Sequence, residues 1–581
     1  MMPFAALVAL ALSPSPGDDP APVPSAAEFA ALGADAVQDL VILGATRPIL
    51  LRVRVRIGDL SFRAAWAEAT RTLHAQLDRD GDGRLTVPEA EANGLSTLLG
   101  PAAPTPAGRA RAEVDFRPKD GVISVEELAE GLRSTSGPFR LRVDGLADRR
   151  TDLLFDHLDR DKDGRLARSE MESLVGSLNR LDRDADELID AAEVNLLGAP
   201  VVASAAMMLG RRARDPAVPP VLELAPGESP VRLARMLIKR YDTGSSRGPG
   251  QRDSKLSPEE FAIPAGAFRT ADISHDGTLN AEELRGYLAQ GPRDAILDVA
   301  LSPDASGRAV ACVRGDDGGP PPAGISVRQL AEAVVEIDVG LIRLDIHIDD
   351  GATAAEAART AFRGRFAASD ANGDGYLEEA ELTGDNGQPS PLAGLFKALD
   401  RDADGKLYPG EMDDFIARQA AAARGRLTLT ASDEGRALFG LLDTDCDRRL
   451  GAREVLDAFA RISACDRDRD GRVTPEEVPH HIQLTLARGD LSALIAPPGG
   501  NPAAAVFPLA SLVPPRPRPA AGPAWFRKMD RNRDGDVSRR EFLGTRDQFD
   551  RLDRDHDGLI APNEAEAATP AKRPGVKAPG G

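Results

Sequence analysis

The sequence predicts a mainly α-helical, elongated, multi-domain protein, built from tandem pairs of helix–loop–helix units with short interspersed β-strands. Two observations support this fold class. A twelve-residue acidic loop recurs ten times in the 581 residues. Apolar side chains at helical spacing precede most copies of the loop, so that a helix enters each one.

Each acidic loop places oxygen-bearing side chains where they converge on one point. Positions 1, 3 and 5 are Asp, Asn or Ser, position 8 is aliphatic, and position 12 is Glu, as in the first copy, Asp78 to Glu89. Ca²⁺ takes about six to eight oxygens, and this spacing supplies them from positions 1, 3 and 5, the carbonyl of position 7 and the two oxygens of position 12. The repeat therefore predicts a protein with many calcium sites.

We predict the residues at positions 1, 3, 5, 7 and 12 as calcium ligands, position 7 through its backbone carbonyl. In the first five loops these are Asp78, Asp80, Asp82, Arg84 and Glu89; Asp159, Asp161, Asp163, Arg165 and Glu170; Asp182, Asp184, Asp186, Leu188 and Glu193; Asp272, Ser274, Asp276, Thr278 and Glu283; and Asp370, Asn372, Asp374, Tyr376 and Glu381. In the second five they are Asp400, Asp402, Asp404, Lys406 and Glu411; Asp443, Asp445, Asp447, Arg449 and Glu454; Asp466, Asp468, Asp470, Arg472 and Glu477; Asp530, Asn532, Asp534, Asp536 and Glu541; and Asp553, Asp555, Asp557, Leu559 and Glu564.

Four stretches depart from the regular pattern. Two loops have Glu187 and Arg448 at position 6 instead of glycine, and a side chain in the left-handed conformation needed there costs on the order of 1 kcal/mol, so we expect weaker sites. Residues 115–127 and 242–260 look like damaged loops, which we expect to pair with a neighbour without binding calcium tightly. Counting them gives twelve loops and six pairs.

Apolar residues four positions and one position before each loop lie on one face of the entering helix. The set comprises Phe155, Phe268, Phe366, Phe396, Phe439, Phe526 and Phe549, with Leu77, Leu158, Leu181, Leu399, Leu442, Met529 and Leu552. We interpret them as core residues. The helix Phe62 to Leu77 enters the first loop, and the aliphatic residue at position 8 is expected to pair with its counterpart in the neighbouring loop.

Three pairs of loops are closely spaced. Their first residues are 23 apart, at 159 and 182, 443 and 466, and 530 and 553. The eleven residues between such loops span about 16 Å as a helix, too little for two full helices and a linker. We expect a break at Gly176-Ser177 in the first of these pairs, one shared helix over Val455 to Cys465 in the second, and a helix capped by Thr545 and Gln548 in the third.

Short strands are predicted between the loop pairs. Leu51 to Ile57 alternates strictly, with Val53, Val55 and Ile57 on one face. Further strands are predicted at 139–143, 219–224, 296–301, 309–314, 334–348, 427–430 and 482–486. We expect them to form small sheets that join neighbouring pairs.

This pattern gives the following predicted domains, in chain order: a signal peptide at 1–20, a strand and first loop pair at 36–135, the second pair at 138–197, the third at 219–290, a β-rich insert at 293–350, the fourth pair at 355–418, the fifth at 426–490, the sixth at 520–568, and a disordered tail at 569–581.

Charge restricts the partners. The formal net charge is −20, and the ten loops carry 37 carboxylates at positions 1, 3, 5 and 12. Ten calcium ions would cancel the formal charge, so binding and folding are expected to be coupled. The acidic balance argues against nucleic acid, and the uncharged run Val194 to Gly210 is too short and interrupted for a membrane span.

The N-terminal apolar run, Met1 to Ser13, resembles a signal-peptide core, so we expect export to the periplasm or beyond the cell. Of the three cysteines, Cys446 lies inside one loop and Cys465 just before the next. A disulfide between them and two free thiols both remain open.

The loops resemble those of the EF-hand calcium-binding superfamily. The closely spaced last pair, from Trp525 to Glu564, and the opening Gln38 to Leu43 segment resemble large exported multi-EF-hand bacterial proteins. The resemblance implies Ca²⁺ as the bound ion and a calcium-binding role. A sensor would expose a Met-rich groove, and the chain has only 8 Met.

The favoured function is therefore a non-enzymatic calcium-binding protein, in which calcium folds and stiffens an exported scaffold or interaction protein. A calcium buffer or sensor is the alternative, and an enzyme with accessory EF-hands is less favoured. The single Asp242-Thr-Gly-Ser245 lacks the second copy that an aspartic protease needs, and His480-His481 has no acidic or cysteine partner at metal spacing.

Overall fold

The computed structural model describes most of the chain. The described residues are 25–44, 47–78, 80–92, 95, 114–116, 119–143, 152–190, 193–194, 219–224, 229–242, 253–303, 309–322, 324–340, 342–382, 392–402, 404–423, 425–432, 437–444, 447, 449–489 and 522–568. The predicted signal peptide, the tail 569–581, most of Val194 to Gly210, Cys446 and the ligand Asp445 lie outside them.

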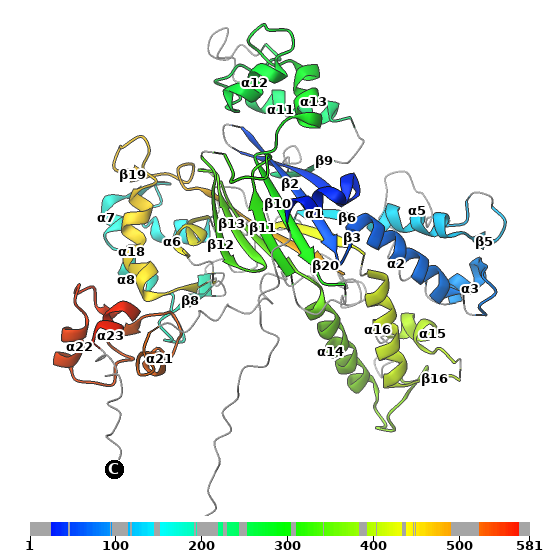
Figure 1. Ribbon diagram of the computed structural model, residues 1–581. Coiled ribbons are helices and arrows are strands. Elements are labelled where there is room, and N and C mark those ends of the chain that lie inside the picture. The colour runs from blue at the N-terminus through cyan, green and yellow to red at the C-terminus, as the bar shows by residue number, and fades with distance from the viewer. Residues whose placement is uncertain are drawn as a thin grey trace, which may run out of the picture.

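Two six-stranded sheets form the centre of the molecule (Figure 1). The first has the order β11-β10-β2-β1-β9, with β3 paired to β2, and the second has the order β12-β13-β14-β20-β17-β6. The strands are β1 Val37–Leu43, β2 Pro48–Ile57, β3 Leu60–Ser61, β6 Phe139–Val143, β9 Val221–Leu224, β10 Ala295–Leu301, β11 Ala309–Arg314, β12 Ser326–Ala331, β13 Val334–Asp338, β14 Ile342–Asp349, β17 Leu427–Ser432 and β20 His480–Arg488.

The prediction of a mainly α-helical fold is therefore wrong. The predicted strands exist at the expected places, but they do not form small sheets between neighbours. Strands far apart in the sequence pair instead, in parallel for β2 with β10, β14 with β20, and β6 with β17. Each parallel connection contains helix–loop–helix units, so the pairing is non-local and local patterning does not reveal it.

The two sheets share one apolar core. Val53, Val55 and Ile57 of β2 belong to the same buried cluster as Leu344 and Ile346 of β14. This is the face that strict alternation predicts for β2. The sheets thus provide a common base to which the helical units attach.

The helices lie around the sheets (Figure 1). They are α1 Ala26–Ala31, η1 Gly33–Ala36, α2 Phe62–Leu77, α3 Val87–Ala92, α5 Val125–Ser136, α6 Leu153–Leu158, α7 Arg168–Met171, α8 Leu174–Leu178, α11 Val231–Tyr241, α12 Ala265–Ala271, α13 Ala281–Gln290, α14 Ala352–Ser369, η2 Ala393–Leu395, α15 Phe396–Leu399, α16 Pro409–Ala423, α17 Ala437–Leu442, α18 Ala452–Ser463, α21 Phe526–Met529, α22 Arg546–Leu552 and α23 Pro562–Ala568. Among the described residues, no helix combines the length and apolarity that crossing a membrane requires.

The close spacing of loops has three different structural results. The segment between the Asp443 and Asp466 loops is the single helix α18, as predicted. Thr545 and Gln548 form a capping box at the start of α22, also as predicted. The helix break predicted at Gly176-Ser177 is wrong, because both residues lie within α8. The helix is interrupted earlier, between the end of α7 at Met171 and the start of α8 at Leu174.

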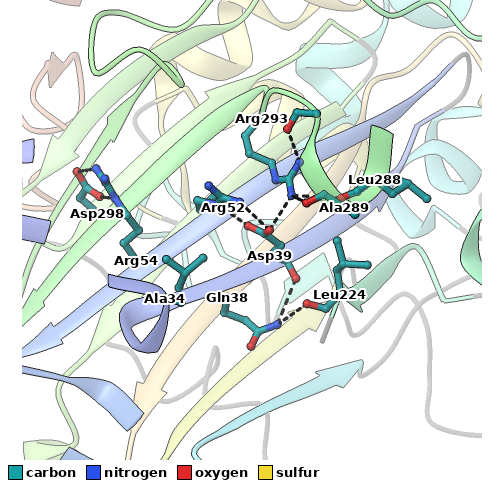
Figure 2. Close-up of polar contacts among 12 residues, drawn as sticks. Ala34, Gln38, Asp39, Arg52, Arg54, Leu224, Leu288, Ala289, Arg293 and Asp298 are labelled. Carbon is teal, nitrogen blue, oxygen red and sulfur yellow. Dashed lines mark hydrogen bonds and ion pairs between the residues drawn. The ribbon is translucent and has the colours of Figure 1, made fainter. Parts of the chain in front are cut away.

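Buried ion pairs attach one helical unit to the first sheet (Figure 2). Arg293, which follows α13, is 4 % exposed; its guanidinium donates to the carbonyl oxygens of Leu288 and Gly291 and to the carboxylate of Asp39 on β1. Asp39 also accepts two hydrogen bonds from Arg52 on β2. Arg293 therefore caps the C-terminus of α13 and fixes it to the sheet.

Candidate metal centres

Each acidic loop is folded around its own first and last carboxylates. In the Asp159 loop, Oδ2 of Asp159 accepts from the position-6 N–H of Gly164 at 2.9 Å. Oε1 and Oε2 of Glu170 accept from the N–H groups of Arg160 at 2.7 Å and Ala167 at 2.9 Å. These bonds draw positions 1 and 12 toward the same centre, as a calcium loop requires.

The other loops repeat these hydrogen bonds. The bond from position 6 to position 1 also occurs at Asp78, Asp182, Asp272, Asp370, Asp400, Asp466 and Asp553. The bond from position 9 to the glutamate occurs at Glu89, Glu193, Glu283, Glu381, Glu411, Glu454, Glu477, Glu541 and Glu564. The glutamate at position 12 is thus held alike in all ten loops, and eight loops also show the bond from position 6 to position 1.

Carboxylate oxygens close enough to share one ion occur in at least five loops. The groups are Asp78, Asp80 and Asp82; Asp159, Asp161 and Glu170; Asp182, Asp184 and Glu193; Asp400, Asp402 and Glu411; and Asp466, Asp468 and Glu477, with the atoms of each group within 4.8 Å of one another. Hard oxygen donors at this spacing suit Ca²⁺.

Backbone strain marks two positions of the loop, one of which the sequence analysis missed. Glu187 at position 6 has φ of 66°, as predicted for a residue replacing glycine. Position 4 is also left-handed wherever the structure describes it, and six of these described residues are not glycine: Lys162, Ala185, His275, Arg469, Arg533 and His556. Two other loops have glycine at position 4, Gly81 and Gly373, and these glycines could have indicated from the sequence that position 4 is left-handed.

Buried carboxylate oxygens support the fit of a cation. Oδ1 of Asp182, Asp400 and Asp553, all at position 1, and Oε1 of Glu381 at position 12 are buried and make no hydrogen bond with any residue that the structure describes. A buried carboxylate oxygen without a partner costs about 1 to 3 kcal/mol or more. A cation at the loop centre would remove that cost.

The Asp530 loop shows the same need for a cation. Asp534 at position 5 is 4 % exposed. Burial raises the pKa of Asp534 to about 7, and the neighbouring carboxylates of Asp536, Glu541 and Asp530 act in the same direction. A bound calcium ion would favour the ionised form of Asp534 instead.

Four pairs of loops join neighbours in the sequence through the position-8 bridge. Leu256 pairs with Leu279 as an isolated bridge. The other three bridges are short strand pairs: β4 Leu85–Thr86 with β5 Val122–Ile123, β15 Leu377–Glu378 with β16 Lys406–Leu407, and β21 Val537–Ser538 with β22 Leu559–Ile560.

The remaining four loops exchange partners. β7 Leu166–Ala167 of the Asp159 loop pairs with β19 Arg472–Val473 of the Asp466 loop, and β8 Ile189–Asp190 of the Asp182 loop pairs with β18 Arg449–Leu450 of the Asp443 loop. The predicted pairing within residues 138–197 and within 426–490 is therefore wrong. A single connecting helix such as α18 holds its two loops at opposite ends, so each loop needs a partner from the other segment.

These four loops form one unit with its own core. We call the Asp159, Asp182, Asp443 and Asp466 loops, with α6, α7, α8, α17 and α18, the four-loop unit. One buried cluster contains Phe155 and Leu178 from the earlier segment and Phe439 and Ile462 from the later one. The first loop of the earlier segment pairs with the second loop of the later segment, and the second loop of the earlier segment pairs with the first loop of the later one. This reciprocal arrangement is the intrachain equivalent of an isologous interface.

The two stretches described as damaged keep much of the loop geometry. Asp115 accepts from Gly121 N–H at 2.8 Å, and Glu127 accepts from the N–H groups of Phe116 at 3.0 Å and Ser124 at 2.9 Å. Asp242 and Glu260 accept from the N–H groups of Ser254 and Ser257. Both stretches thus keep the folded loop conformation that a partner in a loop pair needs.

The cysteine prediction is tested only in part. Cys465 is a buried free thiol packed in the core of the four-loop unit, and Cys312 is also free. Arg448 and Cys446 lie outside the described residues, so the expectations about them remain predictions.

A helix–loop–helix fold with oxygen ligands at these positions defines a calcium-loop protein, and the family comparison agrees. Residues 265–288 and 524–543 match the EF hand family model, and residues 119–171 match the model of an EF-hand domain pair. The chain therefore contains EF-hand domains, which implies calcium binding. No curated protein and no solved structure matches the chain.

The matched domain pair does not correspond to one structural pair. Residues 119–171 include β5 and β7, but β5 pairs with β4 and β7 pairs with β19. The segment β6, a strand of the second sheet, lies between the two loops. The two loops that this match spans thus belong to different units.

Proposed function

We propose that about ten loops bind Ca²⁺ and that calcium acts mainly to fold and stiffen an exported, non-enzymatic scaffold or interaction protein. The observation that supports this most strongly is the reciprocal pairing in the four-loop unit. Calcium there would hold together segments that lie more than 200 residues apart in the sequence, rather than only local hairpins.

The connection of the four-loop unit to the second sheet supports a structural role. Arg328 of β12 donates to the carbonyl oxygen of Thr444 at position 2 of the Asp443 loop, at 2.9 Å. Arg343 of β14 donates to the carbonyl oxygen of Gly440 on α17, at 2.9 Å. A change in the conformation of the Asp443 loop would therefore alter a direct hydrogen bond to β12 of the second sheet.

Charge supports coupling between binding and folding. In the metal-free chain, several carboxylates lie close together in at least five loops, and repulsion among them opposes the closed loop. Calcium would replace that repulsion with attraction, so that its binding energy contributes to the stability of the fold.

The test is removal of calcium from the full chain by a chelator. The proposal predicts loss of helical circular dichroism and a large fall in the melting temperature, both restored by added Ca²⁺ but not by the same concentration of Mg²⁺. A folded chelated form that binds an apolar dye only after calcium is added would contradict the structural role and support a sensor.

A further inference from the structure

Three metal-binding side chains converge on the second sheet, away from the acidic loops. Asp345 and His347 lie two residues apart on β14, so they face the same side of the strand. His481 lies on the adjacent parallel strand β20, in register with Arg343. Arg343 precedes Asp345 by two residues on β14 and therefore lies on the same face of the sheet. The expectation that His480-His481 has no acidic partner is therefore wrong, because the sheet supplies one from a strand more than 130 residues earlier.

The distances from the two imidazoles to Asp345 suit ligands of one ion. Nε2 of His481 lies 3.5 Å from Oδ2 of Asp345, and Nε2 of His347 lies 3.8 Å from the same oxygen. Both distances exceed the roughly 2.7 to 3.2 Å of a hydrogen bond. Two ligands on a tetrahedral zinc ion, each about 2.0 to 2.2 Å from the metal, lie about 3.3 to 3.6 Å apart.

The carboxylate of Asp345 needs a cation. Asp345 is 6 % exposed and His347 is 7 % exposed. Oδ1 of Asp345 is buried and makes no hydrogen bond within the part of the chain that the structure describes.

The arginines on the same face are directed to other groups. Arg328 pairs with Glu336 at 2.5 Å, and Arg343 lies 3.8 Å from Asp338 while donating to the carbonyl oxygen of Gly440. The ion-pair partners of Asp345 among the described residues are both imidazoles. A metal ion bound by all three groups would balance the charge of the buried carboxylate.

Helix α17 covers this cluster closely. A Cβ at Gly440 would lie 2.6 Å from Cγ of the His481 ring, so the glycine allows the helix to rest on the imidazole. The His481 side chain keeps 15 % exposure, which leaves an edge for an ion to enter. An ion held here would lie between the sheet and the four-loop unit.

We propose that Asp345, His347 and His481 bind one divalent transition-metal ion, with Zn²⁺ as the ion to test. Two imidazole nitrogens and one carboxylate suit zinc and its first-row neighbours, whereas Ca²⁺ and Mg²⁺ prefer oxygen ligands. A site of this kind fixes β14 to β20 beneath α17. It differs from the acidic loops in ligand chemistry and therefore in the ion that it selects.

The experiment is a zinc titration of the full chain by calorimetry in saturating Ca²⁺, which keeps the acidic loops filled. We expect one Zn²⁺ per chain at this site, and a loss of at least about tenfold in affinity for His481→Ala and for His347→Ala. The matched control is His480→Ala, because His480 is the neighbouring imidazole and points to the opposite face of β20. This control should bind zinc as the unchanged chain does.

A second measurement covers variants that do not fold. Asp345→Asn nearly preserves the shape of the side chain, and its circular dichroism and calcium stoichiometry report whether the fold is intact. Co²⁺ replacing Zn²⁺ should give visible absorption of a tetrahedral nitrogen–oxygen site in the unchanged chain. Absence of zinc binding by the unchanged chain, or an equal loss of affinity in His480→Ala and His481→Ala, would overturn the proposal.

Discussion

The carboxylate of Asp152 joins two helices that are distant in the sequence. Oδ1 accepts from the N–H groups of Leu154 and Phe155 at 3.0 Å, which caps α6, and Oδ2 accepts from the N–H of Leu438 at 2.7 Å, at the start of α17. Leu154 and Leu438 both belong to the core of the four-loop unit. One buried carboxylate thus accepts hydrogen bonds from the N-terminal backbone N–H groups of two helices, one from each segment of the four-loop unit.

Replacement of Asp152 by alanine should destabilise the four-loop unit. The loss of an N-cap costs about 0.5 to 2 kcal/mol, and a buried N–H left without an acceptor at Leu438 adds about 1 to 3 kcal/mol. We expect a fall of about 2 to 4 kcal/mol in the free energy of unfolding by urea in saturating calcium. Asp156→Ala, an exposed neighbour in the same helix, is the control and should change it by less than about 0.5 kcal/mol. Equal effects of the two variants would contradict the role of Asp152.

Asp152 should also give the stability a defined pH dependence. Burial raises the pKa of Asp152 to about 6 from 3.8. Because the folded-state pKa is the higher one, the folded form binds the proton more tightly, and this contribution is full below pH 4 and is lost as the pH rises to about 6. The difference in unfolding free energy between the unchanged chain and Asp152→Asn should therefore decrease between about pH 4 and 6. A constant difference across that range would contradict the raised pKa.

Glu187→Gly should strengthen the Asp182 loop. Glu187 has φ of 66°, and removing its Cβ relieves roughly 1 kcal/mol of strain, equivalent to about a fivefold gain in affinity. Its contact with Arg540, at 3.4 Å and with Arg540 74 % exposed, contributes little. Glu187→Ala is the matched control, since it removes the same carboxylate but keeps the strained Cβ. The prediction fails if calorimetry gives both variants the same calcium affinity.

The exchanged pairing predicts which loops respond to one another. Glu170→Gln should weaken calcium binding in its own loop and, through the β7–β19 bridge, in the Asp466 loop. The amide of Gly471, which donates to Asp466 at 2.9 Å, reports that loop in nuclear magnetic resonance with labelled glycine. Glu193→Gln, in a loop that pairs with the Asp443 loop, is the control and should leave Gly471 nearly unchanged. A stronger response of Gly471 to Glu193→Gln would favour another pairing.

The last loop pair is attached to the four-loop unit by Arg453. Arg453 donates to the carboxylate of Asp536 at 2.9 and 3.0 Å and to that of Asp557 at 2.8 Å. Because the arginine side chain is 38 % exposed, we expect Arg453→Gln to cost no more than about 1 to 2 kcal/mol. The change should appear as faster hydrogen exchange in α22 and α23. Arg461→Gln is the control, because Arg461 pairs with Asp457 within α18 itself. Unchanged exchange in both helices would rule out this attachment.

Local features of this chain were predictable because their causes are local. Glycine or a strained residue at position 6, the Thr545 cap and the alternating face of β2 each depend on a few neighbouring residues. The shared helix α18 followed from the short segment between two loops together with the absence of a helix-breaking residue within it. The loop ligands lie together for the same reason.

Long-range features were not predictable from these patterns. An alternating row of apolar residues such as Val53, Val55 and Ile57 indicates a strand but not its partner strand, so small sheets were predicted instead of the two large ones. The loop pairing failed at Leu166 and Ile189 because any aliphatic residue at position 8 can pair with any other. The cluster of Asp345 and His481 depends on the register of two parallel strands, which the sequence alone does not reveal.

The central claim is that the acidic loops bind calcium as a set. It is tested most directly by counting the ions on the full chain in native mass spectrometry, over a range of free Ca²⁺ concentrations. The account predicts about ten ions per chain, with the Asp182 and Asp443 loops filling last because they lack glycine at position 6. A maximum of fewer than about five ions would contradict it.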